Sequence, residues 1–263
     1  MTLSVELHRR GSTLIVTLNK PERRNAFDLD MRQSLAEAIF VARDTEDVKA
    51  VVLTGAGGNF CAGGDLKSLS DKERTVHACR DRVRRLHPWF REMVNLEKPV
   101  IAAVEGAAFG AGFHLALASD FVIASTDARF CAVFARIGLV PDLGGLYLLP
   151  RIVGLQRAKE LVFTAREVEA EEALALGIAY AVHPAGKVLD EALALAERFA
   201  GAPTQALGMA KNVLNRSFNL DQDTLAELES YAQALSMHTE YHREAVAHFL
   251  DKKPLVFGWP KPK

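Results

Sequence analysis

The chain has 263 residues, of which 49% are hydrophobic and 25% are charged, and its formal net charge is −1. These proportions are those of a globular protein, and they exclude a disordered chain, a collagen-like repeat and a small disulfide-stapled domain. A nearly neutral chain also lacks the basic stripe that phosphate binding requires, so no nucleic-acid partner is expected.

The cysteine content and the chain ends indicate the compartment. Cys61, Cys79 and Cys131 are an odd number of thiols without a CxxC pair, which is typical of reduced cysteines in an intracellular protein and not of a zinc site. The N-terminus lacks the basic and then apolar pattern of a signal peptide, and the longest apolar stretch, residues 99–118, is interrupted by a glutamate, a histidine and glycines. We therefore expect a cytoplasmic protein without a membrane segment or a metal.

The N-terminal part reads as strands followed by a helix. Residues 4–9 and 13–19 flank a glycine turn and predict a β-hairpin. After Asp28, a favourable N-cap, apolar residues recur at helical spacing. Residues 50–54 are a short apolar run before a glycine cluster, which is the pattern of a buried strand.

The alternation of strands and helices continues along the chain. Residues 70–95 have the spacing of a charged helix, and residues 99–104 predict a second buried strand. Helical spacing resumes near Gly112, residues 121–124 predict a further strand, and nearly everything after about residue 155 is expected to be helical. This alternation predicts an α/β fold, in which a hairpin and a helix form ββα units.

A Gly-Ala-Pro segment at 201–203 divides the chain into a predicted core, residues 1–200, and a helical C-terminal region, residues 201–263. The C-terminal region carries a stripe of apolar residues that must pack on something. Either the core of the same chain or a partner subunit would satisfy it. The stripe consists of Leu225, Leu228, Tyr231, Leu235 and His238.

Two glycine-rich segments, residues 59–66 and 109–115, each follow a predicted strand and precede a helix. Small residues at such turns let a substrate approach the backbone, and two of them together would present convergent N–H donors, as in an oxyanion hole. Tight packing turns are the alternative interpretation. The chain contains no P-loop, HExxH or GxSxG motif.

Asp142 follows Pro141 in an apolar neighbourhood, where loss of hydration raises the pKa of a carboxyl and suits it to act as a base. On residue type alone, an N-cap of a helix starting at Leu143 is the favoured interpretation.

Taken together in their order and spacing, these segments identify the chain as a member of the crotonase (enoyl-CoA hydratase/isomerase) superfamily, which it resembles over essentially its whole length. The segments that carry the resemblance are 20–23 with Asn25 and Ala26, 60–66, 98–106, 138–145 with 149–151, 173–177 and 249–254.

The resemblance implies a ββα-spiral core with a helical C-terminal trimerisation region, assembled as a homotrimer or hexamer. It implies an acyl-CoA thioester as substrate, and no cofactor beyond the coenzyme A that is part of that substrate. The thioester oxygen would accept hydrogen bonds from the amides of Gly64 and Ala111. Substrate contacts would come from Arg24, Ala26, Ala62, Asp65, Leu66, Phe134 and a C-terminal lysine, Lys252 or Lys253.

The catalytic positions depart from the hydratase pattern. Hydratases of the family use two glutamates, and this chain matches those positions with His114 and Phe134. Phe134 cannot transfer a proton, and it would keep water out. Asp142 matches an acid found in the isomerases, which favours an isomerase that moves a 3-enoyl double bond to the 2-position with Asp142 as the single base.

His114 and several alternatives stay open. The helix dipole predicts a neutral His114 ring, which would act as a hydrogen-bond donor or proton relay, or only line the pocket.

The competing functions are a hydratase with an altered acid–base set, a hydrolase or dehalogenase with Asp142 as nucleophile, and an inactive CoA-binding or RNA-binding relative. Asp65 is also a candidate helix cap, and Cys61 and Cys131 are expected to be buried. A basic stretch is expected to be a solvated helix face, and a contact of one of its residues with a CoA phosphate is the alternative; the stretch consists of Lys67, Arg80, Arg82, Arg84 and Arg85. Phe113, Phe134, Tyr147 and the segment 70–95 are candidates to shape the acyl pocket.

Overall fold

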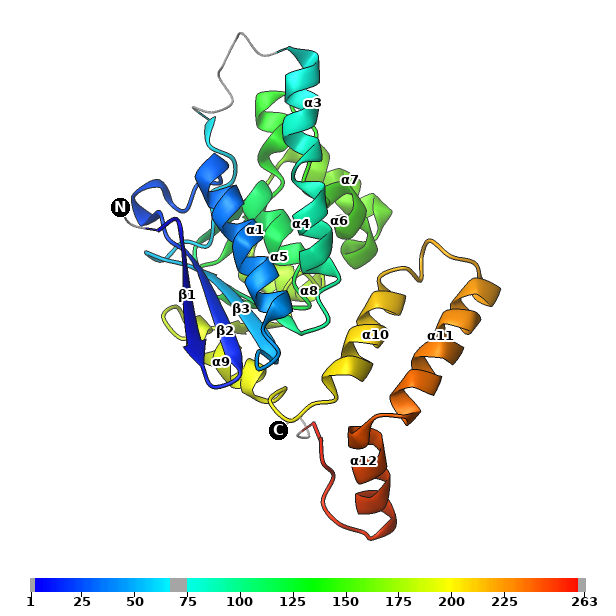
Figure 1. Cartoon of the computed structure of the whole chain (residues 1–263). Coiled ribbons are helices and arrows are strands. Elements are labelled where there is room, and N and C mark those ends of the chain that lie inside the picture. The colour runs from blue at the N-terminus through cyan, green and yellow to red at the C-terminus, as the bar shows by residue number, and fades with distance from the viewer. Residues whose placement is uncertain (1–2, 67–74, 260–263) are drawn as a thin grey trace.

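The computed structural model describes residues 3–66 and 75–259, and within them two β-sheets are covered by helices (Figure 1). The larger sheet has the order β1-β2-β3-β4-β6-β9, with β1 and β2 antiparallel and all the other neighbours parallel. Its strands are β1 (Val5–Arg10), β2 (Thr13–Leu18), β3 (Ala50–Gly55), β4 (Val100–Val104), β6 (Phe121–Ser125) and β9 (Ala181–His183).

The central strands are apolar on both faces because helices cover both. In β3, Val51 and Leu53 belong to one hydrophobic cluster, whereas Ala50 and Val52 belong to a second one on the opposite face. This division follows the two-residue repeat of a strand. The second cluster is completed by α9 (Val188–Glu197).

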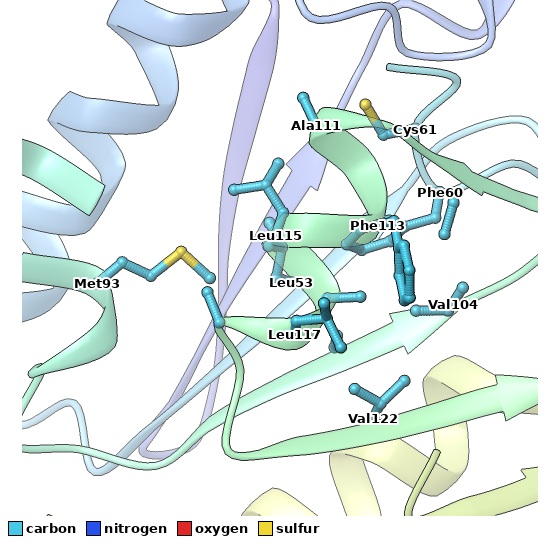
Figure 2. Close-up of a cluster of buried hydrophobic side chains, with 14 of the residues drawn as sticks. Leu53, Phe60, Cys61, Met93, Val104, Ala111, Phe113, Leu115, Leu117 and Val122 are labelled. Atoms are coloured by element: carbon cyan, nitrogen blue, oxygen red, sulfur yellow. The ribbon is translucent and has the colours of Figure 1, made fainter. Parts of the chain in front are cut away.

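The first cluster contains a short, entirely buried helix, α5 (Ala111–Leu117). Figure 2 shows Phe113, Leu115 and Leu117 of this helix among side chains of the sheet and of α4 (His87–Val94). A helix buried on all sides cannot shift without breaking this packing, so the residue that begins it, Ala111, has a fixed position. Phe113, a candidate for the acyl pocket, is fully buried in this cluster, and that expectation is wrong.

A second, smaller sheet consists of β5 (Ala107–Phe109), β7 (Arg129–Cys131) and β8 (Val168–Glu169). These strands were not predicted, and neither was β9, because two or three residues are too few to show a period. The expectation that nearly everything after residue 155 is helical is therefore wrong at β8 and β9.

Helices connect and cover the strands. The single helix expected over 70–95 is two helices, because the chain is interrupted before Pro88; residues 70–74 lie outside the described part. The remaining helical segments are η1 (Pro21–Arg23), α1 (Leu29–Asp44), α3 (Val76–Arg84), η2 (Val133–Ile137), α6 (Gly145–Val153), α7 (Leu155–Thr164) and α8 (Ala170–Ala175).

The described residues after 203 form only helices: α10 (Thr204–Leu214), α11 (Gln222–Met237) and α12 (Glu240–Leu250). Figure 1 shows α11 and α12 standing away from the core, whereas α10 packs beside it with Gly208 buried. Lys211 connects α10 to the core, since its ammonium group donates to Asp120 at 2.6 Å and to the carbonyl of Lys98 at 3.0 Å.

Helix α11 contains no buried residue and leaves Tyr231 and Leu235 exposed. The expectation that its stripe packs on the core of the same chain is therefore not met. Across the described residues, none of the helices combines the length and apolarity that a membrane crossing requires.

Candidate active site

The two glycine-rich turns lie against each other, as predicted. Cys61 and Ala108 form a bridge, in which the Phe109 amide donates to the Cys61 carbonyl at 2.9 Å. Gly63 has a φ of +93°, and a β-carbon there would lie 2.7 Å from the Phe109 carbonyl oxygen. Only glycine permits this approach, so the glycines that the sequence places here are needed to bring the turns together.

Several backbone amides at these turns have no protein acceptor among the described residues. They include the amides of Gly64 and Ala111, which the family resemblance assigns to the thioester oxygen, and those of Gly112 and Phe113 in the first turn of α5. Ala111 is the first residue of α5, where a helix leaves its amides unpaired, and Figure 2 shows it near Cys61 of the other turn. Both residues line a cavity of about 240 Å³, called the inner cavity below. Two donors to one oxygen are what an oxyanion hole requires, and these two residues are the candidates for it.

Asp142 lines the same inner cavity. Burial raises the pKa of its carboxyl above the usual value, while the positive charges of Arg32 and Arg82 act in the opposite direction. The interpretation as a helix N-cap is wrong, because α6 begins at Gly145 with Gly144 as its cap residue. The carboxyl of Asp142 is thus available to a molecule in the cavity.

The backbone around Asp142 is a tight turn over residues 142–145. The Gly145 amide donates to the Asp142 carbonyl at 2.9 Å, and Leu143 and Gly144 have φ values of +43° and +71°. A left-handed leucine costs on the order of 1 kcal/mol, which the complete burial of its side chain offsets. The strained turn holds Asp142 at the edge of the cavity.

His114 and Phe134 lie together, but only Phe134 reaches the cavity. Their rings stack with centroids 5.2 Å apart and planes 5° apart. Phe134 lines the inner cavity, whereas His114 is fully buried and is not part of the lining. Burial lowers the pKa of His114 to about 4, so its ring is neutral as expected, although burial and not the helix dipole is the main cause.

A larger cavity of about 750 Å³, called the outer cavity below, continues from the inner one. Asp142 and Phe134 line both, as do Leu66, Arg82, Ile137 and Leu139. Tyr147 and Val83 line only the outer cavity, so Tyr147 and part of the segment 70–95 shape it as predicted. The surface is mainly apolar, which suits the tail of an acyl group.

Arg32 was not predicted as a site residue, and Arg82 was a candidate only for contact with a CoA phosphate. Arg82 was assigned with its neighbours to a solvated helix face, but it lines both cavities, and Arg32 of α1 lines the inner one. No local signal distinguishes them from other surface arginines, because they reach Asp142 only through the packing of α1 and α3.

The residues expected to bind CoA surround the first turn. The Ala62 amide donates to the Arg24 carbonyl at 2.9 Å, and Ala62 and Leu66 line the inner cavity. Asp65 forms an ion pair with Arg23 at 2.7 Å. Its expected role as a helix cap concerns the segment after residue 66, which lies largely outside the described residues.

Asn25 holds this loop in place, a role that the sequence did not predict because it indicated Asn25 only as part of a family motif. Its side chain is fully buried with a φ of +56°, and it accepts from the Lys20 amide at 2.9 Å. It also donates to the carbonyls of Ala56 and Asn59 at 2.9 and 2.7 Å. Ala26, which follows it, is half-buried at the entrance to α1.

The C-terminal lysines lie apart from the two cavities, and two of the cysteines are buried. Lys253 pairs with Asp251 at 2.9 Å, and neither Lys252 nor Lys253 is among the described residues that line the two cavities. Cys61 and Cys131 are buried as expected, and burial raises their pKa values to about 12 and about 11. No cluster of three or more metal-ligating side chains is present among residues 3–66 and 75–259.

The α/β core thus brings two apposed turns, the candidate amides and a carboxyl to one cavity. The family model described as enoyl-CoA hydratase/isomerase matches residues 8–259. The chain belongs to this family, and the predicted crotonase fold is confirmed.

Individual relatives agree. The 1,2-epoxyphenylacetyl-CoA isomerase of Escherichia coli K12 is 38% identical over 252 residues, which cover 95% of this chain and 96% of that protein. The short-chain-enoyl-CoA hydratase of Clostridium acetobutylicum is 33% identical, covering 96% of each chain. The solved structure of an enoyl-CoA hydratase/isomerase from Cupriavidus metallidurans CH34 has a TM-score of 0.94 and 39% identity, covering 100% of both chains.

Proposed function

We propose that this enzyme is an acyl-CoA isomerase that converts a 3-enoyl thioester into the conjugated 2-enoyl thioester, with Asp142 as its one acid–base group. The observation that carries the proposal is that the Asp142 carboxyl shares the inner cavity with the amides of Gly64 and Ala111. The substrate itself supplies coenzyme A, and no other cofactor is needed.

The proposed reaction has two proton transfers. The thioester oxygen accepts from both amides, and Asp142 takes a proton from C2, so that the electron pair of the C2–H bond forms an enolate. The protonated carboxyl then delivers the proton at C4, and the double bond moves from C3–C4 to C2–C3. The two amides stabilise the negative oxygen, at about 3 kcal/mol for one donor in other enzymes.

Burial suits Asp142 to this exchange. A carboxyl whose pKa is raised is a stronger base than an exposed aspartate, yet the charges of Arg32 and Arg82 favour its ionised form. Both proton transfers occur on one face of the substrate, so a single group is sufficient.

The surroundings argue against hydration. At the two positions where hydratases of the family have glutamates, Phe134 is apolar and His114 is buried behind it. Neither side chain can hold and activate a water molecule in the inner cavity for attack on C3 of the 2-enoyl thioester, so hydration lacks its nucleophile.

The test is Asp142→Asn with a 3-enoyl-CoA substrate in D₂O. We expect at least about a 1,000-fold loss of kcat and loss of deuterium incorporation, because the amide cannot accept the proton. Asp81→Asn, which changes an exposed carboxylate of α3, is the control and should keep full activity. Unchanged turnover of Asp142→Asn would remove Asp142 from the reaction.

The name of the Escherichia coli relative, 1,2-epoxyphenylacetyl-CoA isomerase, favours a second substrate, a thioester with a ring epoxide. The outer cavity is large enough for a ring. The panel should therefore include 3-enoyl, 2-enoyl and ring-epoxide thioesters. Water addition to a 2-enoyl thioester would instead support a hydratase, and a covalent adduct on Asp142 a hydrolase or dehalogenase. Binding of the thioester without proton exchange would indicate an inactive CoA-binding protein, and salt-dependent RNA affinity an RNA-binding one.

The assembly is proposed to be a homotrimer or hexamer of a cytoplasmic enzyme. Support comes from α11 and α12, which stand away from the core and expose large apolar residues such as Tyr231, Leu235 and Phe249. A partner subunit would cover them, and its surface would bring Lys252 or Lys253 toward a neighbouring CoA. Mass measurement by light scattering tests the subunit number.

A further inference from the structure

The His114 ring is confined from two directions. Phe134 covers one face at 5.2 Å with nearly parallel planes. At the ring edge lies Gly145, where an added β-carbon would be only 2.2 Å from Nε2 and Cε1 of the histidine. Gly145 is residue four of the 142–145 turn, and its amide donates to the Asp142 carbonyl. The ring therefore supports the turn that carries the candidate base.

The same ring is poorly placed to move protons. Neither Nδ1 nor Nε2 has a hydrogen-bond partner among the described residues, and the side chain has no exposed surface. The Asp142 backbone acts to raise the pKa of the ring, but burial, which lowers it, is the larger effect, and the ring stays neutral. Between the ring and the inner cavity stands Phe134, which has no group that could relay a proton.

We propose that His114 is a positioning residue: its uncharged ring, held between Phe134 and Gly145, supports the 142–145 turn and thereby places the Asp142 carboxyl, and it carries no proton in the reaction. This inference rests on the proposed function, in which Asp142 is the base.

The central experiment is a double-mutant cycle of His114→Ala and Gly145→Ala. Removing the ring leaves the strained turn without its support, and we expect kcat to fall about 10- to 100-fold with KM within about threefold, since a displacement near 1 Å has effects of this size. Gly145→Ala should cause a similar loss by pushing the ring or the turn. In the double variant the methyl group occupies space that the ring has vacated, so kcat should equal that of His114→Ala within about twofold.

A third variant, His114→Phe, keeps a ring and removes both nitrogens. It should lose less activity than His114→Ala, and the rise of its kcat with pH should keep the wild-type position because Asp142 still carries the proton. Loss of that rise would identify His114 as a proton carrier and overturn the inference. Independent, multiplying losses in the double-mutant cycle would overturn it as well.

A measurement without turnover separates this inference from the proposed function. The same cycle on the midpoint of thermal unfolding should show that Gly145→Ala destabilises the wild type but not the His114→Ala protein. If the wild type neither isomerises a thioester nor exchanges its α-protons, the proposed function fails. Additive shifts of the midpoint would show that the supporting contact itself is absent.

Discussion

Acidification should destabilise this protein specifically through His114. The ring is fully buried, and burial lowers its pKa from 6.5 to about 4 in the folded chain. The unfolded chain therefore binds a proton at this residue below about pH 6.5, whereas the folded chain does not until about pH 4. Protons favour the state that binds more of them, so stability falls as the pH is lowered across this window and levels off below it.

The size of the effect follows from the same values. A tenfold change in proton affinity corresponds to about 1.4 kcal/mol, so the difference between 6.5 and about 4 corresponds to about 3 kcal/mol of unfolding free energy at full titration. Above about pH 7 the contribution is absent. The loss is a large fraction of the 5–15 kcal/mol that stabilises typical domains.

The assay is urea unfolding of the wild type and His114→Phe at several pH values between 7.5 and 4, at one protein concentration because assembly would add to stability. Asp142, whose raised pKa gives the opposite pH dependence, is present in both proteins, so its contribution cancels when their unfolding free energies are subtracted. The wild type should lose about 3 kcal/mol relative to the variant on acidification. A difference that does not change with pH would show that the ring titrates equally in both states and would refute this account of its burial.

Three further predictions concern other parts of the molecule. Asn25→Ala should cost about 3 kcal/mol in urea unfolding, because it leaves buried backbone groups without partners and places alanine at a φ of +56°; a loss below about 1 kcal/mol would contradict this. Lys211→Met should lower the free energy of unfolding by about 2 kcal/mol, because it leaves Asp120 without its cation. Proteolysis between α9 and α10 should become faster in this variant, whereas Lys211→Arg, which keeps the charge, should remain resistant to the protease. Val83→Trp should lower kcat/KM about tenfold or more for a ring-bearing or long acyl thioester and less than threefold for a four-carbon one, because Val83 lines only the outer cavity. The control is Arg84→Trp, which changes an exposed residue of the same helix. An equal loss of kcat/KM for both substrates would show that the outer cavity does not hold the acyl tail.

The strongest local patterns were read correctly from the sequence. The hairpin of β1 and β2 and the buried strands β3, β4 and β6 follow from the hydrophobic period, since each is five or six residues long. Short strands such as β5 and β8 do not repeat a pattern, and their pairing with β7 is decided by contacts between distant segments.

The candidate active site was also predictable from the sequence only in part. Glycines after two strands indicated that backbone amides are exposed at the turns, and the order of the motifs indicated the family and Asp142. These are properties of neighbouring residues, and a sequence records them directly. On residue type alone a helix cap was the favoured interpretation of Asp142, and only the start of α6 at Gly145 decided against it.

Tertiary structure alone decided which side chains face Asp142. Arg32 of α1 and Arg82 of α3 are 50 positions apart in the sequence, yet both line the inner cavity. His114, which the sequence placed among the catalytic candidates, lies behind Phe134. The physical reason is that the direction of a side chain depends on how whole elements pack, and that packing is set by buried surface gathered from the entire chain.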